Sequence, residues 1–360
     1  MFFNNFNSRN FYRKINKYLA PILIFSAFVT FSIRDLNDSR FSSANFTTKS
    51  IGDFLHLNDF GINPFFSSIF VRFISFSIII GLITFVELRN SKFRNLRNIS
   101  IARISKSEGY KNADIWYFFF NSFKTQFPII VVFITLGLSS VNIGIGNFLQ
   151  RIYSPYIPSN INELSSILLL IITILLNDFI GFFHHKISHD YPFLWDLHEF
   201  HHSATEMTIL SRDRASLLND FLVQPLTLPI SIYTALLLDI TLTKGYNLPF
   251  YIYAFHSAMS VIADRLGHSS LKVIYPKPLS FIYMSPSLHW IHHSINPSHY
   301  DKNFGQTFPF WDKIFGTYLD ESHLKDIKAF GVENSSYNKY HPLYAYTILP
   351  IKKILMRISS

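Results

Sequence analysis

The stretch that decides both the fold and the chemistry is Asp178–Ser203, DFIGFFHHKISHDYPFLWDLHEFHHS. Its histidines are spaced as ligands carried on helices: His185, His189, His198, His201 and His202. A second H-x-x-H-H run, His289, His292 and His293, also ends in a serine, Ser294. Positions i, i+3 and i+4 share one face of a helix, so each run is predicted to aim its imidazoles at one point.

The number of histidines predicts a metal centre rather than isolated surface or core residues. Imidazole suits Zn, Cu, Fe or Ni, and two triplets with an additional pair exceed the needs of one tetrahedral ion. The pattern therefore favours two metal ions. The chain contains no cysteine, which excludes thiolate ligands and disulfides and leaves nitrogen and oxygen as donors.

The composition is typical of a membrane protein. The 360 residues include 39 Phe, and only 15% of them are charged. The net charge of +9 does not form a nucleic-acid stripe, because the basic residues cluster beside apolar segments, as they do in cytoplasmic loops near anionic lipid. We expect membrane lipids as partners and no nucleic acid.

Apolar segments predict an all-α integral membrane protein, a bundle of transmembrane or re-entrant helices with a histidine-rich cytoplasmic cap holding a dimetal centre. The expected spans, the last of which is short, are Tyr18–Ile33, Phe65–Val86, Phe127–Phe148, Ser165–Phe183, Phe221–Leu238 and Pro249–Ala263. We divide the chain into N-terminal membrane helices with a basic loop (1–150), a catalytic domain (151–345) and a basic C-terminal tail (346–360).

Charge asymmetry gives a topology. Residues 1–17 and 87–115 are basic and are assigned to the cytoplasm, whereas the connection 149–164 carries only Arg151 and is assigned to the outside. The fourth span then returns the first histidines to the cytoplasm. If the last two apolar segments cross as a pair, the second histidine run emerges on the same side.

Several further residues are candidates for supporting the metals. Asp178 lies two helical turns before His185 and is predicted to accept a ligand's second N–H. Asp196 and Glu199 either do similar work or face solvent. Either His256 or His268 can complete the second metal's shell, and His299 follows the last run closely. The apolar and basic segment Leu343–Arg357 is interpreted as an interfacial helix or as an ordinary docked one.

Two kinds of chemistry fit histidine-bound metals beside a membrane. Zinc would polarise water for hydrolysis, and hydrolytic sites usually add a carboxylate base within a ligand motif such as H-E-x-x-H. Those letters occur once in this sequence, at His198–His202 (HEFHH). Iron would use O2 against an unactivated C–H bond of an apolar substrate. The apolar setting favours redox chemistry.

The ordered motifs resemble the fatty acid hydroxylase superfamily, in its sterol desaturase branch. The matching blocks are Asp178–His189, Leu194–Ser203, Ser285–Ser294, Asn303–Gly305 and Trp311–Thr317. Phe182, Phe183 and Lys186 depart from the Tyr, Trp and Arg of the family pattern and leave the expected ligands intact.

The resemblance implies an O2-dependent hydroxylase or desaturase with two Fe ions, acting on a sterol, fatty acyl or other lipid in the bilayer. It implies the ligands His185, His189, His198, His201, His202, His268, His289, His292 and His293. It also implies an external electron donor, cytochrome b5-like, ferredoxin or reductase, because the chain has no flavin, haem or iron–sulfur motif. The alternatives are a membrane zinc hydrolase and a non-catalytic metal-binding relative.

Overall fold

The computed structural model describes residues 113–124, 151–158 and 160–359, together with the isolated positions 81 and 85. Its regular structure in this part is helical, with an isolated β-bridge between Ser294 and Phe330. The elements are α5 (Ala113–Lys124), η5 (Ser154–Tyr156), α8 (Glu163–Asp190), α9 (Pro192–His202), η6 (Ser211–Asp213), α10 (Leu217–Thr243), α11 (Leu248–Gly267), α12 (Leu279–Ile282), α13 (Leu288–His292), η7 (Pro297–His299), α14 (Phe310–Phe315), η8 (Glu321–Asp326), η9 (Ser336–Lys339) and α15 (Pro342–Ile358).

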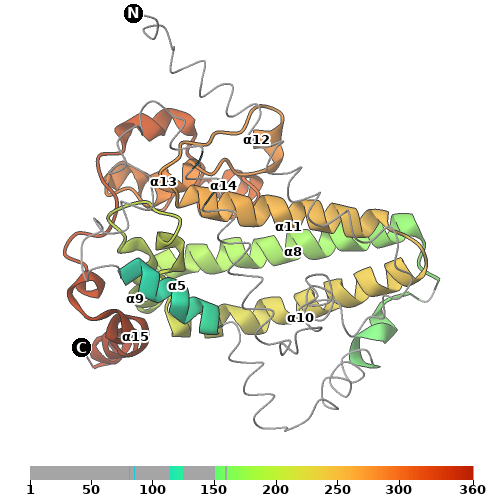
Figure 1. Ribbon diagram of the computed structural model, residues 1–360, viewed down its shortest axis with the longest axis horizontal. Helices are drawn as coiled ribbons and strands as arrows, with labels where there is room; N and C mark the ends of the chain where they lie inside the picture. The colour runs from blue at the N-terminus through green and yellow to red at the C-terminus, as the bar shows by residue number, and fades with distance from the viewer. Residues whose placement is uncertain (1–80, 82–84, 86–112, 125–150, 159, 360) are drawn as a thin grey trace, which may run out of the picture.

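Three long helices, α8, α10 and α11, run side by side, and α8 contacts both of the others (Figure 1). The chain runs in one direction along α8 and α11 and in the opposite direction along α10. The C-terminal ends of α8 and α11 therefore lie at the same end of the bundle, where α9 and α13 also lie. This arrangement brings the histidine-bearing segments together.

Helix α8 is long and strongly apolar. The side-chain oxygen of Asn162 caps its first turn by accepting from the Ser165 N–H at 2.9 Å. Its 28 residues are about 42 Å long at 1.5 Å per residue, more than the ~30 Å hydrocarbon core of a bilayer. Among the described residues, α8 alone is long and apolar enough to cross a membrane, and it contains the predicted span Ser165–Phe183.

The remaining predicted spans have different outcomes. Three lie outside the described residues except at positions 81 and 85: Tyr18–Ile33, Phe65–Val86 and Phe127–Phe148. The predicted span Phe221–Leu238 lies within α10, whose apolar part is the shorter stretch Pro229–Thr243. The segment Pro249–Ala263 forms most of α11, which has 20 residues but is not apolar enough to count as a span.

A proline separates the two helices that carry the first histidines. Pro192 begins α9, and the residue before it, Tyr191, is extended at φ −108° and ψ 120°, as the residue before a proline prefers. Because the chain turns back at this point, α9 packs against the end of α8. His198 and His202 consequently face His185 and His189.

Helix α15 packs on the other face of α9 and binds its acidic residues. Arg357 donates to both carboxylate oxygens of Asp196, at 2.6 and 3.0 Å, and Lys353 pairs with Glu199. Asp196 was predicted to support a metal ligand, and its carboxylate instead holds this helix. Helix α15, Pro342–Ile358, extends across the boundary drawn at residue 346 from the sequence.

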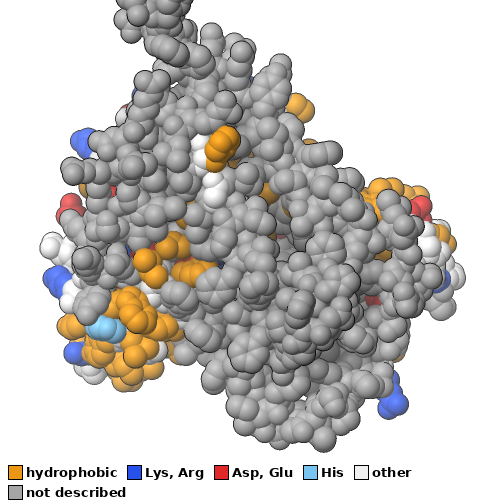
Figure 2. Space-filling model, in the orientation of Figure 1, with side chains coloured by type: hydrophobic (Ala, Val, Ile, Leu, Met, Phe, Trp, Pro, Cys, Tyr) orange, Lys and Arg blue, Asp and Glu red, His pale blue; other side chains and the backbone are white. Residues whose placement is uncertain are grey.

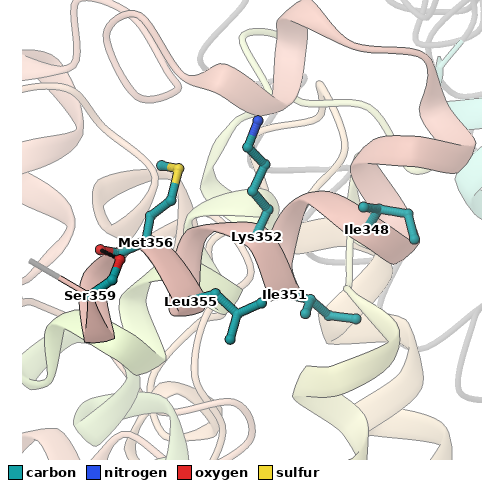
Figure 3. A pocket seen from close by; sticks show the side chains of 6 residues that line it. All are labelled: Ile348, Ile351, Lys352, Leu355, Met356 and Ser359. Carbon is teal, nitrogen blue, oxygen red and sulfur yellow. Dashed lines mark hydrogen bonds between the residues drawn. The ribbon is translucent and has the colours of Figure 1, made fainter.

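The outer face of α15 is apolar. Ile348, Ile351 and Leu355 line a shallow groove beside Lys352, and all three apolar side chains are exposed (Figure 3). Figure 2 shows hydrophobic side chains gathered over this helix. The helix is thus docked through its ion pairs and through Ala345, Tyr346 and Leu349, which are buried in a core cluster, and it presents an apolar surface outward.

Candidate metal centre

Nine histidines form two adjoining groups at one end of the bundle. The five-histidine group contains His185, His189, His198, His202 and His292. The four-histidine group contains His201, His268, His289 and His293. Within each group one ring nitrogen per residue lies within 4.8 Å of all the others. All nine ligands expected from the sequence are therefore brought together, and His268 rather than His256 joins the second group.

Each H-x-x-H-H run is divided between the two groups, so the expectation that a run aims at one point is wrong. His198 and His202 face the five-histidine group, and His201 faces the other. In the second run, His289 and His293 face the four-histidine group and His292 the five-histidine group. On a helix, positions i+3 and i+4 lie on opposite sides of position i, about 100° apart, so one run can serve two neighbouring centres.

The ring nitrogens converge closely. In the four-histidine group the Nε2 atom of His293 lies 2.9 Å from that of His289 and 3.1 Å from that of His201. In the five-histidine group the Nε2 of His202 lies 3.2 Å from those of His189 and His198. Such separations match the ~3.3 Å between nitrogens that lie 2.0–2.1 Å from one tetrahedral ion.

The tautomers leave lone pairs at the centre. His185 Nδ1 donates to the Phe304 carbonyl at 2.7 Å, and His292 Nδ1 donates to the Lys302 carbonyl at 2.8 Å. A carbonyl only accepts, so the proton of each neutral ring must be on Nδ1 and its Nε2 must be an acceptor. Both Nε2 atoms are buried, with no hydrogen-bond partner among the described residues. Converging buried acceptors need a cation, and the residues present therefore fit bound metal ions.

Burial also keeps these rings neutral. It lowers the pKa of His201 to about 3 and that of His289 to about 4, because a charged imidazolium loses its hydration there. The pKa values of His202, His268 and His293 are lowered as well, first by burial and then by neighbouring histidines. Histidine binds metals in its neutral form, so the set is prepared to bind them at physiological pH.

The loop Asp301–Gly305 orients the five-histidine group, a role that residue spacing did not predict. Besides the two carbonyl contacts, Asp301 Oδ1 accepts from His189 Nδ1 at 3.3 Å. Asp301 and Asn303 have positive φ values of 58° and 55°, which turn successive backbone groups toward the histidines. A Cβ at Gly305 would lie 2.7 Å from the Phe308 carbonyl, so the backbone approaches too closely there for a side chain.

Asp312 holds this loop in place. Its buried carboxylate accepts from the backbone N–H groups of Phe304 at 2.8 Å and Gly305 at 2.7 Å, and from Thr317 Oγ1 at 2.6 Å. Asp178 lies on the same side of the centre, where it accepts from Trp311 Nε1 at 3.0 Å. Both carboxylates thus act on the metal centre through the segment 301–317, and neither hydrogen bond runs directly to a histidine.

Asp312→Asn is expected to lower metal affinity or turnover by up to about 10-fold. Losing a direct outer partner of a metal ligand costs about 10–100-fold, and Asp312 acts one contact further out, through the loop. The asparagine amide retains one acceptor oxygen, but its NH2 group would face a backbone N–H. Both of these groups are donors, so the backbone N–H would lose its acceptor. Turnover and metal content of the purified variant measure the effect. Thr317→Val removes only the hydroxyl contact and is the matched control. Equal behaviour of both variants would contradict the role given to Asp312.

The other candidates lie away from the two groups. The His256 ring stacks on Phe308 at 5.5 Å between centroids, within the packing around α11. His299 lies beside His323, with their ring centroids 6.1 Å apart. His184 belongs to neither group, as expected from its position about 100° around the helix from His185.

Comparison with known proteins agrees with this geometry. Residues 170–317 match the fatty acid hydroxylase family model, and this stretch contains all nine clustered histidines. The alkylglycerol monooxygenase of Caenorhabditis elegans is 30% identical over 173 residues, 46% of this chain and 31% of that protein. The human alkylglycerol monooxygenase is 26% identical over 175 residues, 49% of this chain and 33% of that protein.

A bacterial relative is more distant. The ornithine lipid hydroxylase OlsE of Rhizobium tropici is 25% identical over 134 residues, 37% of each chain.

The chain thus spans about a third of the length of the curated relatives it matches. No solved structure matches it significantly. The ordered histidine motifs, their convergence and these matches together support a fatty acid hydroxylase domain over residues 170–317, and the relatives named here are oxidoreductases.

Proposed function

We propose that the protein is a membrane-bound di-iron enzyme that uses O2 to hydroxylate a lipid. The observation that carries the proposal is the pair of adjoining histidine groups with buried, converging nitrogens. The names of the relatives support hydroxylation over desaturation and do not single out the sterol desaturase branch. An ether or acyl chain of a polar lipid is the proposed substrate class.

The five- and four-histidine groups would each hold one ion. Bound iron would supply the reduction of O2 that places one oxygen atom in a C–H bond and releases the other as water, using two electrons from an external donor. His185 and His292 hold their protons on Nδ1, where backbone carbonyls of the loop 301–305 accept the N–H groups. Phe304 covers the five-histidine group, with its ring centroid 5.0 Å from that of His189 and 5.5 Å from that of His185. This apolar cover limits the access of water to the reacting carbon.

The membrane placement is part of the proposal. The apolar length of α8 would span the bilayer and deliver His185 and His189 just below the headgroups, on the cytoplasmic side by the charge asymmetry of the sequence. The outward apolar face of α15, with Lys352 beside it, would lie along the same interface. A lipid chain entering from the bilayer would then reach the metals without crossing water.

Zinc-dependent hydrolysis is the competing function. Among the described residues both groups consist of histidines alone, without the carboxylate base that hydrolytic zinc sites usually hold. Glu199, the carboxylate within the run His198–His202, instead accepts from Ser335 and pairs with Lys353. The histidine groups therefore hold no base for activating water and suit O2 chemistry better.

Lipid extracts of cells with and without the gene, analysed by mass spectrometry under 18O2, test the proposal. We expect a lipid that gains one oxygen atom, labelled from O2 and not from water. A product that has lost two hydrogens would indicate desaturation instead. Purified protein that contains zinc alone and turns over its lipid without O2 would overturn the oxygenase assignment.

A further inference from the structure

A third group of potential ligands lies apart from the two histidine groups. It consists of His299 on η7 with His323 and Asp326 on η8. One ligand atom from each residue lies within 4.8 Å of the other two. Neither the family motifs nor the proposed hydroxylase chemistry uses His323 or Asp326.

His299 is the unusual member of this group. Its side chain is inaccessible to solvent, at 0% exposure, and neither ring nitrogen has a hydrogen-bond partner among the described residues. A buried polar group without a partner is costly, and an imidazole with two such nitrogens requires an explanation. A metal ion would satisfy the nitrogen that carries the lone pair, since imidazole is a good ligand in its neutral form.

The other two residues close the site from the solvent side. His323 Nδ1 lies 3.7 Å from Asp326 Oδ2, and both side chains are about two-fifths exposed, at 41% and 42%. The rings of His299 and His323 are nearly perpendicular, at 88°. Small rotations of the two exposed side chains would bring all three donors to the 2.0–2.2 Å that zinc requires, and water can supply the fourth ligand.

The backbone around this group is already fixed. The side chain of Asn296 accepts from Ser298 N–H at 3.1 Å, and its amide donates to the Asp326 carbonyl at 3.2 Å. One residue therefore caps η7 and ties it to the end of η8. The three donors are consequently held near each other by contacts that do not involve the metal.

We propose that His299, His323 and Asp326 bind one Zn²⁺ ion, separate from the dimetal centre. Two imidazoles and one carboxylate form a donor set for a borderline ion such as zinc, whereas Ca²⁺ and Mg²⁺ prefer oxygen ligands. The site would fasten η8 to η7. Because Asp301 follows His299 by two residues, the ion would also fix the start of the loop that orients the five-histidine group.

The test measures zinc on full-length protein whose iron has been loaded first. After equilibration with Zn²⁺ and removal of free metal, elemental analysis is expected to give one zinc per chain with the iron content unchanged. His323→Gln is expected to abolish this zinc and to keep the iron, and its exposed position makes misfolding a small concern. Glu321→Gln removes a charge from the same short helix outside the ligand group and is expected to keep the zinc.

The outcomes separate this site from the proposed function. The third site would be overturned if the iron-loaded protein bound no zinc, or if it gained zinc only by losing iron. It would also be overturned if His323→Gln kept the zinc. Bound zinc should also protect the peptide 321–326 from proteolysis in the parent protein and not in His323→Gln. Neither readout depends on lipid turnover. The difference of one zinc between the parent and His323→Gln also holds whichever metal the nine histidines bind, so failure of the hydroxylase proposal would leave the test interpretable.

Discussion

His201→Ala and His292→Ala are each expected to abolish lipid oxidation and to lose metal from one of the two groups. His201 belongs to the four-histidine group and His292 to the five-histidine group, so each variant removes one nitrogen from a different proposed ion. Losing a ligand should exceed the roughly 10–100-fold cost of losing an outer partner. Product formation and iron content of the purified variants are the measurements.

A matched control lies next to a proposed ligand. His184 adjoins His185 and belongs to neither group, so His184→Asn is expected to retain its iron and most of its turnover. If lipid oxidation survived in both alanine variants, the ligand assignment would fail. Loss of iron in His184→Asn would show that the measurement reports general disruption of the helix end.

Arg214→Met is expected to lower the free energy of unfolding by about 3–5 kcal/mol, the usual cost of leaving a buried charge unpaired. Arg214 is 1% exposed and donates to Asp114 at 2.5 Å, to Ser203 at 2.9 Å and to Asn338 at 2.8 Å. It therefore joins α5, the end of α9 and η9. Unfolding of the protein in detergent, followed by tryptophan fluorescence, measures the change.

The same substitution two residues earlier is the control. Arg212 pairs with Asp264 at 2.6 Å, and both side chains are about two-fifths exposed, at 42% and 37%. A surface ion pair contributes about 0–1 kcal/mol, so Arg212→Met should change stability little. Equal destabilisation by the two variants would show that burial of the Arg214 pair is not the source of its effect.

The sequence predicted which histidines come together because spacing on a helix is a local property. The nine histidines were identified from i, i+3 and i+4 repeats and the family pattern, and all nine converge. The division of each run between two groups was not predicted. His201 and His202 belong to different groups. Which of them belongs to which group depends on how α9 packs against α13, and local spacing does not determine that packing.

The polar partners of the site were harder to predict. Phe304 and Lys302 act through backbone carbonyls, which every residue possesses, so residue type gives no signal. The Asn303–Gly305 motif was recognised in the sequence. Only the folded loop shows that it positions backbone carbonyls to accept from the histidines. Asp196 was assigned to the metals because of its place in the run, whereas its partner Arg357 is 161 positions further along the chain.

The contact between α9 and α15 has a consequence for biosynthesis. One face of α9 carries three of the clustered histidines, and the carboxylates on its other face pair with residues 154 and 161 positions further along the chain. During translation, Lys353 and Arg357 are therefore synthesised well after the histidines. We therefore expect stable iron loading to be a late event in maturation, after residues 353 and 357 have emerged and neutralised the buried acids behind α9.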